Sequence, residues 1–184
     1  MKVKVKARLS FPALFEAEQY QGQGDFSYSA QFLVEEGSES DKAVREAIKQ
    51  VATEKWKDKA PGILKGMSNN KQLCCYYEGE IVGRDGYDGM MVLSAKRKQN
   101  DGRPDVRDRD ASPLTEKDGK PYAGCYVVGI VDIWAQDNNY GKGVRATLMG
   151  VQFVKDGSAF SKSVKATDDD FEDLGVEEED EMFS

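Results

Sequence analysis

The sequence predicts a mainly β fold, a closed or nearly closed barrel that carries one inserted helix. Residues 126–135 form a long, apolar, β-branched run, and residues 144–154 read as a strand returning beside it. Residues 2–11 alternate almost perfectly between polar and apolar side chains. β-branched runs and strict alternation are both typical of strands. Because both strands of the 126–154 hairpin are apolar at most positions, we expect both of its faces to be partly covered, as in a barrel.

The first predicted strand, residues 2–11, has one apolar face and one basic face. Val3, Val5 and Leu9 point toward the expected core, and Lys2, Lys4 and Lys6 lie on the other side. Such lysines often guard the edge of a sheet. The alternative is that they track the phosphates of a nucleic acid.

The next stretch is expected to be a loop with aromatic content, residues 12–25, followed by a second strand at 26–34. The second strand places several aromatic residues on one face, which is more often a core face than a stacking platform. Residues 41–59 show apolar positions at helical spacing, so we predict the one helix there. Ser40 or Asp41 can cap this helix, Pro61-Gly62 should end it, and its charges are expected on the solvent side.

Two further strands are predicted at residues 71–82 and 90–98. The glycine-rich turn between them, residues 83–89, lacks the spacing and the following helix of a phosphate-binding loop. Residues 100–124 then form a connection that is long for a hairpin link and rich in Arg and Asp. The final hairpin is joined by a turn-forming segment, residues 136–142.

Composition narrows the function classes. The chain of 184 residues contains no histidine, which removes the commonest general base and the Ser-His and Cys-His pairs. Its three cysteines lack metal-ligand spacing and are expected in the core, in a reducing compartment. No apolar run is long enough for a transmembrane helix, and we expect no metal and no cofactor.

The net charge of -7 conceals two oppositely charged parts. Residues 168–184 hold ten Asp or Glu and no Lys or Arg, whereas residues 1–167 hold 26 Lys and Arg against 23 acids, a net charge of +3. We therefore expect a domain at residues 1–165 and a disordered acidic tail at residues 166–184. Such like-charge blocks are often interaction tails.

Four aspartates raise the alternative of a metal-dependent nuclease, namely Asp105, Asp108, Asp110 and Asp132. Three of them are interleaved with arginines in the long loop. Guanidinium groups compete for carboxylates and oppose cation binding, so a salt-bridged loop is favoured over a metal site. A third alternative is a virion or adaptor protein that acts through its acidic tail.

Several stretches resemble the bacteriophage single-stranded DNA-binding proteins with an OB fold and an acidic C-terminal tail, a family formerly catalogued as a domain of unknown function. They are residues 11–15 (FPALF), 103–106 (RPDV), 122–127 (YAGCYV), 141–144 (GKGV) and 148–157 (LMGVQFVKDG). The resemblance covers nearly the whole chain. It implies an OB-fold-like barrel and a non-enzymatic protein that coats single strands in phage DNA replication, recombination or repair, in the cytoplasm of the infected host. The helix between the second and third strands departs from the simplest five-strand scheme.

Single-strand binding needs cations along a backbone path and aromatic faces on which any base can stack. The cations that we expect to contact phosphates are Lys96, Arg97, Lys98, Arg103, Arg107, Arg109, Lys142 and Arg145, with Lys2, Lys4 and Lys6 secondary. The aromatic candidates for stacking are Tyr76, Tyr77, Tyr87, Trp134 and Tyr140.

The tail is expected to bind replication or recombination proteins and to compete with DNA for the basic path. Its candidate residues are Asp168, Asp169, Asp170, Phe171, Glu177, Glu178, Glu179, Asp180, Glu181 and Phe183. These acids are interspersed with apolar side chains, which suits docking into a basic groove with an apolar pocket. We expect single-stranded DNA as the main partner and no membrane, and keep a homodimer as an alternative to a monomer.

Overall fold

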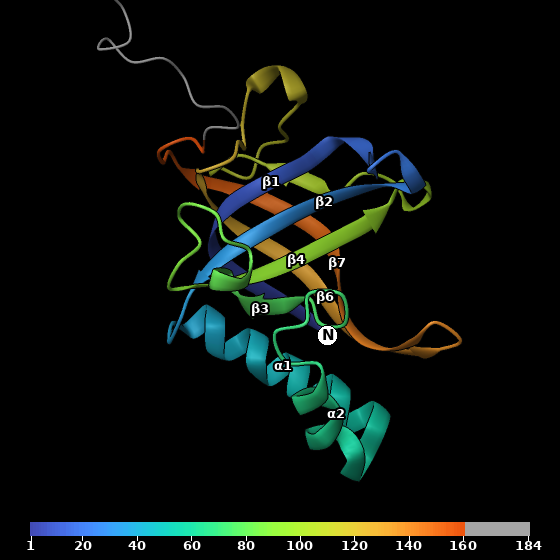
Figure 1. The fold of residues 1–184 in the computed structure, drawn as a ribbon. Coiled ribbons are helices and arrows are strands. Elements are labelled where there is room, and N and C mark those ends of the chain that lie inside the picture. Colours follow the sequence, from blue (N-terminus) through green and yellow to red (C-terminus); the bar gives the residue numbers. More distant parts are fainter. Residues whose placement is uncertain (161–184) are drawn as a thin grey trace, which may run out of the picture.

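The computed structural model describes residues 1–160, so the predicted tail and the predicted domain boundary at residue 165 lie outside the described residues. Within that range, seven strands form one sheet in the order β3-β4-β2-β1-β6-β7-β5. The strands are β1 Lys2–Tyr20, β2 Gln23–Glu35, β3 Tyr76–Glu78, β4 Met90–Lys98, β5 Asp105–Arg107, β6 Tyr126–Asn138 and β7 Gly141–Lys155. An additional pairing of β4 with β7 closes β1, β2, β4, β7 and β6 into a barrel (Figure 1). The mainly β, OB-fold-like architecture is confirmed.

The core of the barrel follows from the alternation of side chains along each strand. On β6, Val127, Val131 and Ile133 alternate along the strand and are buried, whereas Trp134 lies on the other face and remains exposed. Fully buried residues from β1, β2, β4 and β7 complete the interior, among them Val5, Leu9, Phe32, Leu93 and Leu148. The three cysteines, Cys74, Cys75 and Cys125, are free and buried, in agreement with their predicted place in the core.

The first strand is longer than predicted, because β1 continues to Tyr20 instead of giving way to a loop at residues 12–25. Phe11 has a left-handed backbone, with φ 46°, and the register with β2 shifts between Ser10 and Ala13. A bulge of this kind bends a strand without ending it. Pro12 therefore follows a bend in the strand, and the true turn lies at Gln21 and Gly22.

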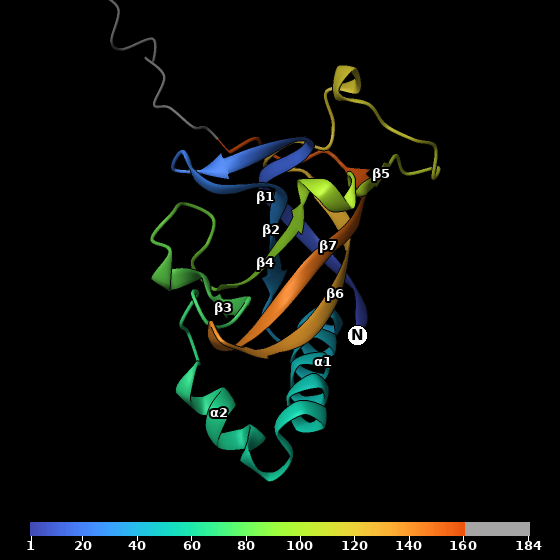
Figure 2. The same ribbon diagram turned by 90° about the vertical axis from the view of Figure 1, so that its right-hand side faces the viewer.

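The helical segment lies at one end of the barrel and has two parts (Figures 1 and 2). Helix α1 spans Glu39–Trp56, a short 3-10 turn covers Lys57–Lys59, and helix α2 spans Ala60–Gly66. The cap is Ser38, whose hydroxyl accepts a hydrogen bond from the Asp41 amide at 3.2 Å. Pro61 does not end the helical segment as predicted, because it lies in the first turn of α2, where its missing N–H is tolerated.

One helix charge is not on the solvent side, which corrects the expectation for this helix. Asp41 is 4% exposed, and it accepts hydrogen bonds from the Tyr76 hydroxyl at 2.6 Å and from Arg45 Nε at 2.8 Å. Burial opposes ionisation of this carboxyl, but the bonds from Tyr76, Gly37 N–H and Arg45 outweigh it and lower its pKa. The buried carboxylate thus joins α1 to β3.

The remaining differences concern strand length. The predicted strand at residues 71–82 is reduced to β3, and the long connection contains a short strand, β5, that pairs in parallel with β7. The β6–β7 hairpin extends further than predicted, because Asn138 pairs with Gly141 and leaves a two-residue turn, Asn139 and Tyr140. In the described part of the chain, no helix combines the length and the apolar character needed to cross a membrane.

Candidate nucleic-acid interface

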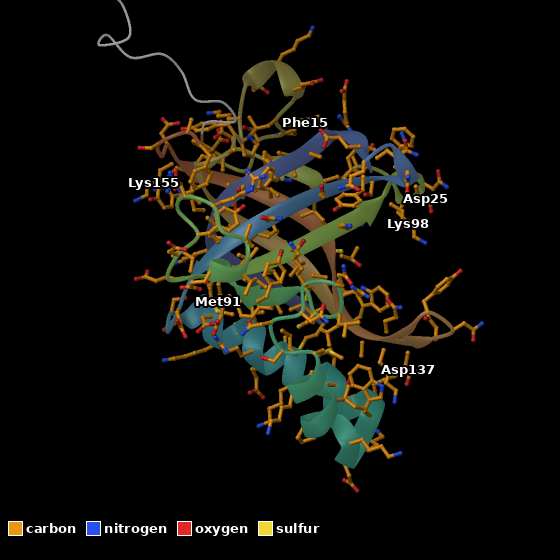
Figure 3. The ribbon with its side chains drawn as sticks, in the orientation of Figure 1. Phe15, Asp25, Met91, Lys98, Asp137 and Lys155 are labelled. Carbon is orange, nitrogen blue, oxygen red and sulfur yellow. The ribbon has the colours of Figure 1, made fainter. Side chains whose placement is uncertain are left out.

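A groove of about 830 Å³ lies on the outside of the barrel where β4 meets β7. Strand β4 contributes one wall and the β6–β7 hairpin contributes the other. Figure 3 shows Asp25 and Lys98 close together toward one end of this region and Asp137 on the β6–β7 hairpin toward the other. The lining residues are Asp25, Ser27, Lys71, Cys75, Ser94, Lys96, Arg97, Lys98, Asp101, Trp134, Gln136, Asn138, Tyr140, Arg145, Ala146 and Thr147.

The alternation of each strand explains why polar side chains collect here. On β4, Leu93 and Ala95 are buried, so Ser94, Lys96 and Lys98 must point outward. The same rule places Trp134 and Gln136 of β6 and Arg145 and Thr147 of β7 on the outer face, where all four line the groove. The closed barrel therefore turns one row of each strand toward a shared surface.

Trp134 offers an aromatic surface in this groove. Its side chain is 40% exposed, and its indole N–H donates a hydrogen bond to the Thr147 hydroxyl at 3.0 Å. The bond fixes the ring on β6 through a residue of β7. A partly exposed indole held in one orientation can accept a stacked base without regard to its identity.

Arg145 lies opposite Trp134 in the register of β6 and β7. Its Nε donates to Gln136 Oε1 at 3.0 Å, and its Nη1 donates to the Gln72 carbonyl at 2.7 Å. A guanidinium group held by two acceptors loses less conformational freedom when it contacts a phosphate. The groove thus places a fixed cation beside its aromatic ring.

The groove is basic overall. Five cations line it, Lys71, Lys96, Arg97, Lys98 and Arg145, against two carboxylates, Asp25 and Asp101. Arg97 also has a structural role, because it donates to the carbonyls of Asp101 and Gly102 at 2.7 and 2.8 Å. The positive electrostatic potential of the groove therefore favours an anionic ligand.

Tyr140 stands at the tip of the β6–β7 hairpin with 92% of its side chain exposed. It lines the same groove as Trp134. Lys142, which was predicted with it, pairs with Asp137 in the hairpin and is exposed, although it does not line the groove. Of the predicted residues, the groove brings together Lys96, Arg97, Lys98, Trp134, Tyr140 and Arg145.

Three predicted stacking residues lie elsewhere, which corrects that part of the prediction. Tyr76, Tyr77 and Tyr87 are 6%, 3% and 1% exposed, so their rings pack in the protein and offer no open face to a base. The hydroxyl of Tyr87 donates a hydrogen bond to Gln31 Oε1 and is also hydrogen-bonded to the Ser10 hydroxyl, each at 2.6 Å. These tyrosines have polar neighbours in the sequence, but their hydroxyl groups form hydrogen bonds inside the protein and their rings are not exposed.

The arginines of the long loop do not line the groove either. Arg107 pairs with Asp105 at 3.0 Å, and Arg109 donates to the Val154 carbonyl at 3.0 Å. Strand β5 pairs with β7 at Gly150–Gln152, whereas β4 pairs with it at Thr147, so this loop, with Arg103, lies further along β7.

The basic stripe of β1 lies outside the groove as well. Lys2, Lys4 and Lys6 are exposed and pair with β6 opposite Asp132, Ile130 and Val128. They line no part of the groove between β4 and the β6–β7 hairpin. We therefore leave them out of the candidate interface.

The four aspartates of the nuclease alternative are dispersed among separate partners. Asp105 pairs with Arg107, Asp108 with Lys120 at 3.0 Å, and Asp132 with the terminal ammonium of Met1 at 2.6 Å. Asp110 accepts from Ser112. Residues 1–160 contain no group of three or more metal-ligating side chains placed to share an ion. This geometry gives the nuclease alternative no support.

Sequence reasoning missed Lys71, Gln136 and Thr147 as groove residues. Gln136 and Thr147 share their strand faces with Trp134 and Arg145, so alternation from the predicted residues could have identified them. Lys71 gave no comparable signal, because it precedes β3 and reaches the groove only through the closure of the barrel.

The sequence matches, over residues 1–183, the family described as "Enterobacter phage Enc34, ssDNA-binding protein". A protein of Acyrthosiphon pisum secondary endosymbiont phage 1, named p50, is 44% identical over 188 residues, with 100% of both chains covered. The structure also resembles the single-stranded DNA-binding protein from bacteriophage Enc34 in complex with ssDNA, with a TM-score of 0.71 and 24% identity over 87% of this chain and 89% of that one.

A second structure of the single-stranded DNA-binding protein from bacteriophage Enc34 gives a TM-score of 0.69 at 25% identity, with 93% of this chain and 90% of that chain covered. The single-stranded DNA-binding protein gp2.5 of bacteriophage T7 gives 0.58 at 13% identity, over 90% and 98% of the two chains, which shows a shared fold. The family match spans nearly the entire chain. This chain therefore belongs to the family of the Enterobacter phage Enc34 single-stranded DNA-binding protein.

Proposed function

We propose that this protein binds and coats single-stranded DNA, largely without regard to sequence, and that it does so through the groove between β4 and the β6–β7 hairpin. The observation that carries the proposal is the pairing of Trp134 with Arg145 in that groove, beside Lys96 and Lys98. An exposed ring takes a base and the surrounding cations take the phosphates, which is the combination that single-strand binding requires. Membership in the Enc34 family supports the same function.

Sequence independence is expected from the kind of groups that line the groove. Every base presents a π-face to a ring such as Trp134, and every nucleotide carries the same phosphate. Lysine and arginine contacts to phosphate position the strand and carry no sequence information. The protein needs no nucleophile for this role, and we place it among non-enzymatic proteins of phage replication, recombination or repair, acting in the cytoplasm of the infected host.

The acidic tail, residues 166–184, is assigned a recruiting role in this proposal. Its ten carboxylates and its interspersed apolar side chains suit a basic partner surface with an apolar pocket. The same charges would compete with DNA for the groove. Removing residues 168–184 takes the net charge from -7 to +3, so the truncated protein should bind DNA more tightly, most of all at low salt.

The experiment that tests the function is a binding titration across a salt series with single-stranded and duplex DNA of the same length. We expect tighter binding to the single strand, because only unpaired bases can reach the ring of Trp134. Affinity should fall steeply with salt, with a logarithmic slope of about −0.7 for each phosphate neutralised on a single strand. Equal affinity for both forms of DNA, or a nearly flat salt dependence, would refute the proposal.

A further inference from the structure

We propose that the DNA path extends beyond the groove to a second base-stacking position, Tyr20, at the end of β1. This inference rests on the proposed function. Tyr20 is 74% exposed, far more than a core residue of a strand would be. Its neighbour in space is Lys96, a cation that already lines the groove.

The contact between Lys96 and Tyr20 links the β1–β2 hairpin to the groove. The ammonium nitrogen of Lys96 lies 5.9 Å from the centroid of the Tyr20 ring, within the range of a cation–π contact. An exposed contact of this kind is weak, so a ligand can displace the lysine from the ring at little cost. A base could then stack on Tyr20 while Lys96 turns toward the adjoining phosphate.

The register of β1 and β2 places Tyr20 on the groove side of the hairpin. Glu18 pairs with Ser27, which lines the groove, and Tyr20 follows two positions later on β1, although the register with β2 shifts between Gln19 and Tyr20. The contact of the Lys96 ammonium with the Tyr20 ring also places that ring on the groove side. Gln19 pairs with Phe26, and both belong to the opposite face. Tyr20 and Phe26 are thus exposed aromatic residues on two different sides of one hairpin.

The turn next to Tyr20 has a fixed backbone geometry. Gln21 and Gly22 form the turn with φ of 49° and 70°, and the Gln19 side chain donates a hydrogen bond to the Gly24 carbonyl at 2.6 Å. Beyond the bend at Phe11, β1 continues to Tyr20. Ala13 and Leu14 anchor this segment in the core, and its end carries the exposed ring of Tyr20 beside the groove.

The tips of the β1–β2 and β6–β7 hairpins lie on the same side of the barrel (Figures 1 and 2). Both hairpins contribute residues to the lining of the groove. Asp25 of the β1–β2 hairpin lies close to Lys98, and Asp137 marks the other hairpin (Figure 3). A strand lying along the groove would meet Tyr140 and Trp134 toward one end, and Lys96 and then Tyr20 toward the other. The length of DNA that the protein engages therefore depends on Tyr20.

The test compares the full-length protein with its Tyr20→Ala, Tyr20→Phe and Phe26→Ala variants on oligothymidylates of about 4 to 16 nucleotides, the span of sites known for such folds. Affinity should rise with length and then level off. We expect Tyr20→Ala to weaken binding of the longest oligonucleotide by about 5-fold or more, the value of one base–aromatic stack. The affinity of the Tyr20→Ala variant should also stop rising at a shorter oligonucleotide length. Tyr20→Phe and Phe26→Ala should behave as the unaltered protein does.

Identical affinities and an identical levelling length for Tyr20→Ala and the unaltered protein would overturn the inference. Equal losses in Tyr20→Ala and Phe26→Ala would overturn it too, because both faces of the hairpin would then contribute alike. If the unaltered protein binds and Trp134→Ala weakens it while Tyr20→Ala does not, only this inference fails. If the unaltered protein does not bind single strands at all, the proposed function fails with it.

Discussion

The indole N–H of Trp56 donates a hydrogen bond to the carboxylate of Asp137 at 2.9 Å, across 81 positions of the chain. Trp56 is the last residue of α1 and is 7% exposed. Asp137 lies on the β6–β7 hairpin between Gln136 and Asn138, both of which line the groove. The end of the helix therefore holds one wall of the candidate interface.

Replacing Trp56 by phenylalanine should weaken single-strand binding although Trp56 lies outside the groove. The variant keeps an aromatic ring in the core but loses the donor to Asp137, a hydrogen bond worth about 0.5–1.5 kcal/mol. If that energy positions the hairpin, affinity should fall by about 2- to 10-fold. Fluorescence anisotropy with a labelled oligonucleotide measures the affinity, and Gln50→Ala on the exposed face of α1 is the control. A folded Trp56→Phe protein with unaltered affinity would show that the contact does not position the interface.

Trp134→Ala should reduce affinity for single strands by about 5- to 150-fold, the range expected for one base–aromatic stack. A matched control exists on the same face of the same strand, because Tyr126 is 39% exposed and Trp134 is 40% exposed. Tyr126 does not line the groove, so Tyr126→Ala should bind nearly as the unaltered protein does. Equal losses in the two variants would point to a general effect on β6 rather than stacking on Trp134.

The salt dependence should distinguish the groove from the basic stripe of β1. A double variant, Lys96→Gln with Lys98→Gln, removes two groove cations and should lower the magnitude of the salt slope by about 1.4 if each contacts one phosphate. The matched double variant Lys4→Gln with Lys6→Gln removes the same charge from outside the groove. We expect its slope to stay close to that of the unaltered protein. If the salt slope falls more in the Lys4→Gln/Lys6→Gln variant than in the Lys96→Gln/Lys98→Gln variant, the DNA lies on β1.

Asp41 should make the fold sensitive to acid. Its folded pKa is lowered, so as the pH falls the unfolded chain takes up the proton first. The stability that the carboxylate contributes is complete above its unfolded pKa, about 3.9, and is lost as the pH falls through the lower folded pKa. Asp41→Asn should cost about 1–3 kcal/mol at neutral pH, because it weakens the bonds from Tyr76 and Arg45.

Thermal unfolding across pH measures this effect. The gap in melting temperature between Asp41→Asn and the unaltered protein should be widest near neutral pH and should narrow below pH about 4. Asp58→Asn removes an exposed carboxylate beyond the end of α1 and should leave the melting temperature unchanged at neutral pH. A gap that is constant from neutral to acidic pH would exclude ionisation of Asp41 as the cause.

The barrel could be predicted because its main strands have local sequence patterns that are typical of strands. Alternation on β1 and the β-branched run of β6 depend on local sequence alone, and the buried faces of both agree with the structure. The extension of β1 could not be predicted in the same way, because Phe11 and Pro12 look like the start of a loop. Only pairing with β2 across a bulge keeps that segment in the sheet.

The groove residues could be predicted where they lie on a strand with a clear alternating pattern. Lys96 and Lys98 belong to β4, Trp134 belongs to β6, and the pattern of each strand points these side chains outward. What the sequence could not show is which strands become neighbours, since the closure between β4 and β7 joins residues about 50 positions apart. That closure brings Lys96 and Lys98 of β4 to the face that carries Trp134 and Arg145, and it leaves Arg103 outside the groove.

The measurement that tests the central claim most directly is ultraviolet cross-linking of the full-length protein to a single-stranded oligonucleotide, followed by mass spectrometry to locate the attached nucleotides. We expect the adducts on peptides of the groove, at Trp134 and Tyr140, because their exposed rings line it. Adducts confined to the Arg-rich loop at residues 100–124 or to the lysines of β1, with none on the groove, would contradict the assignment.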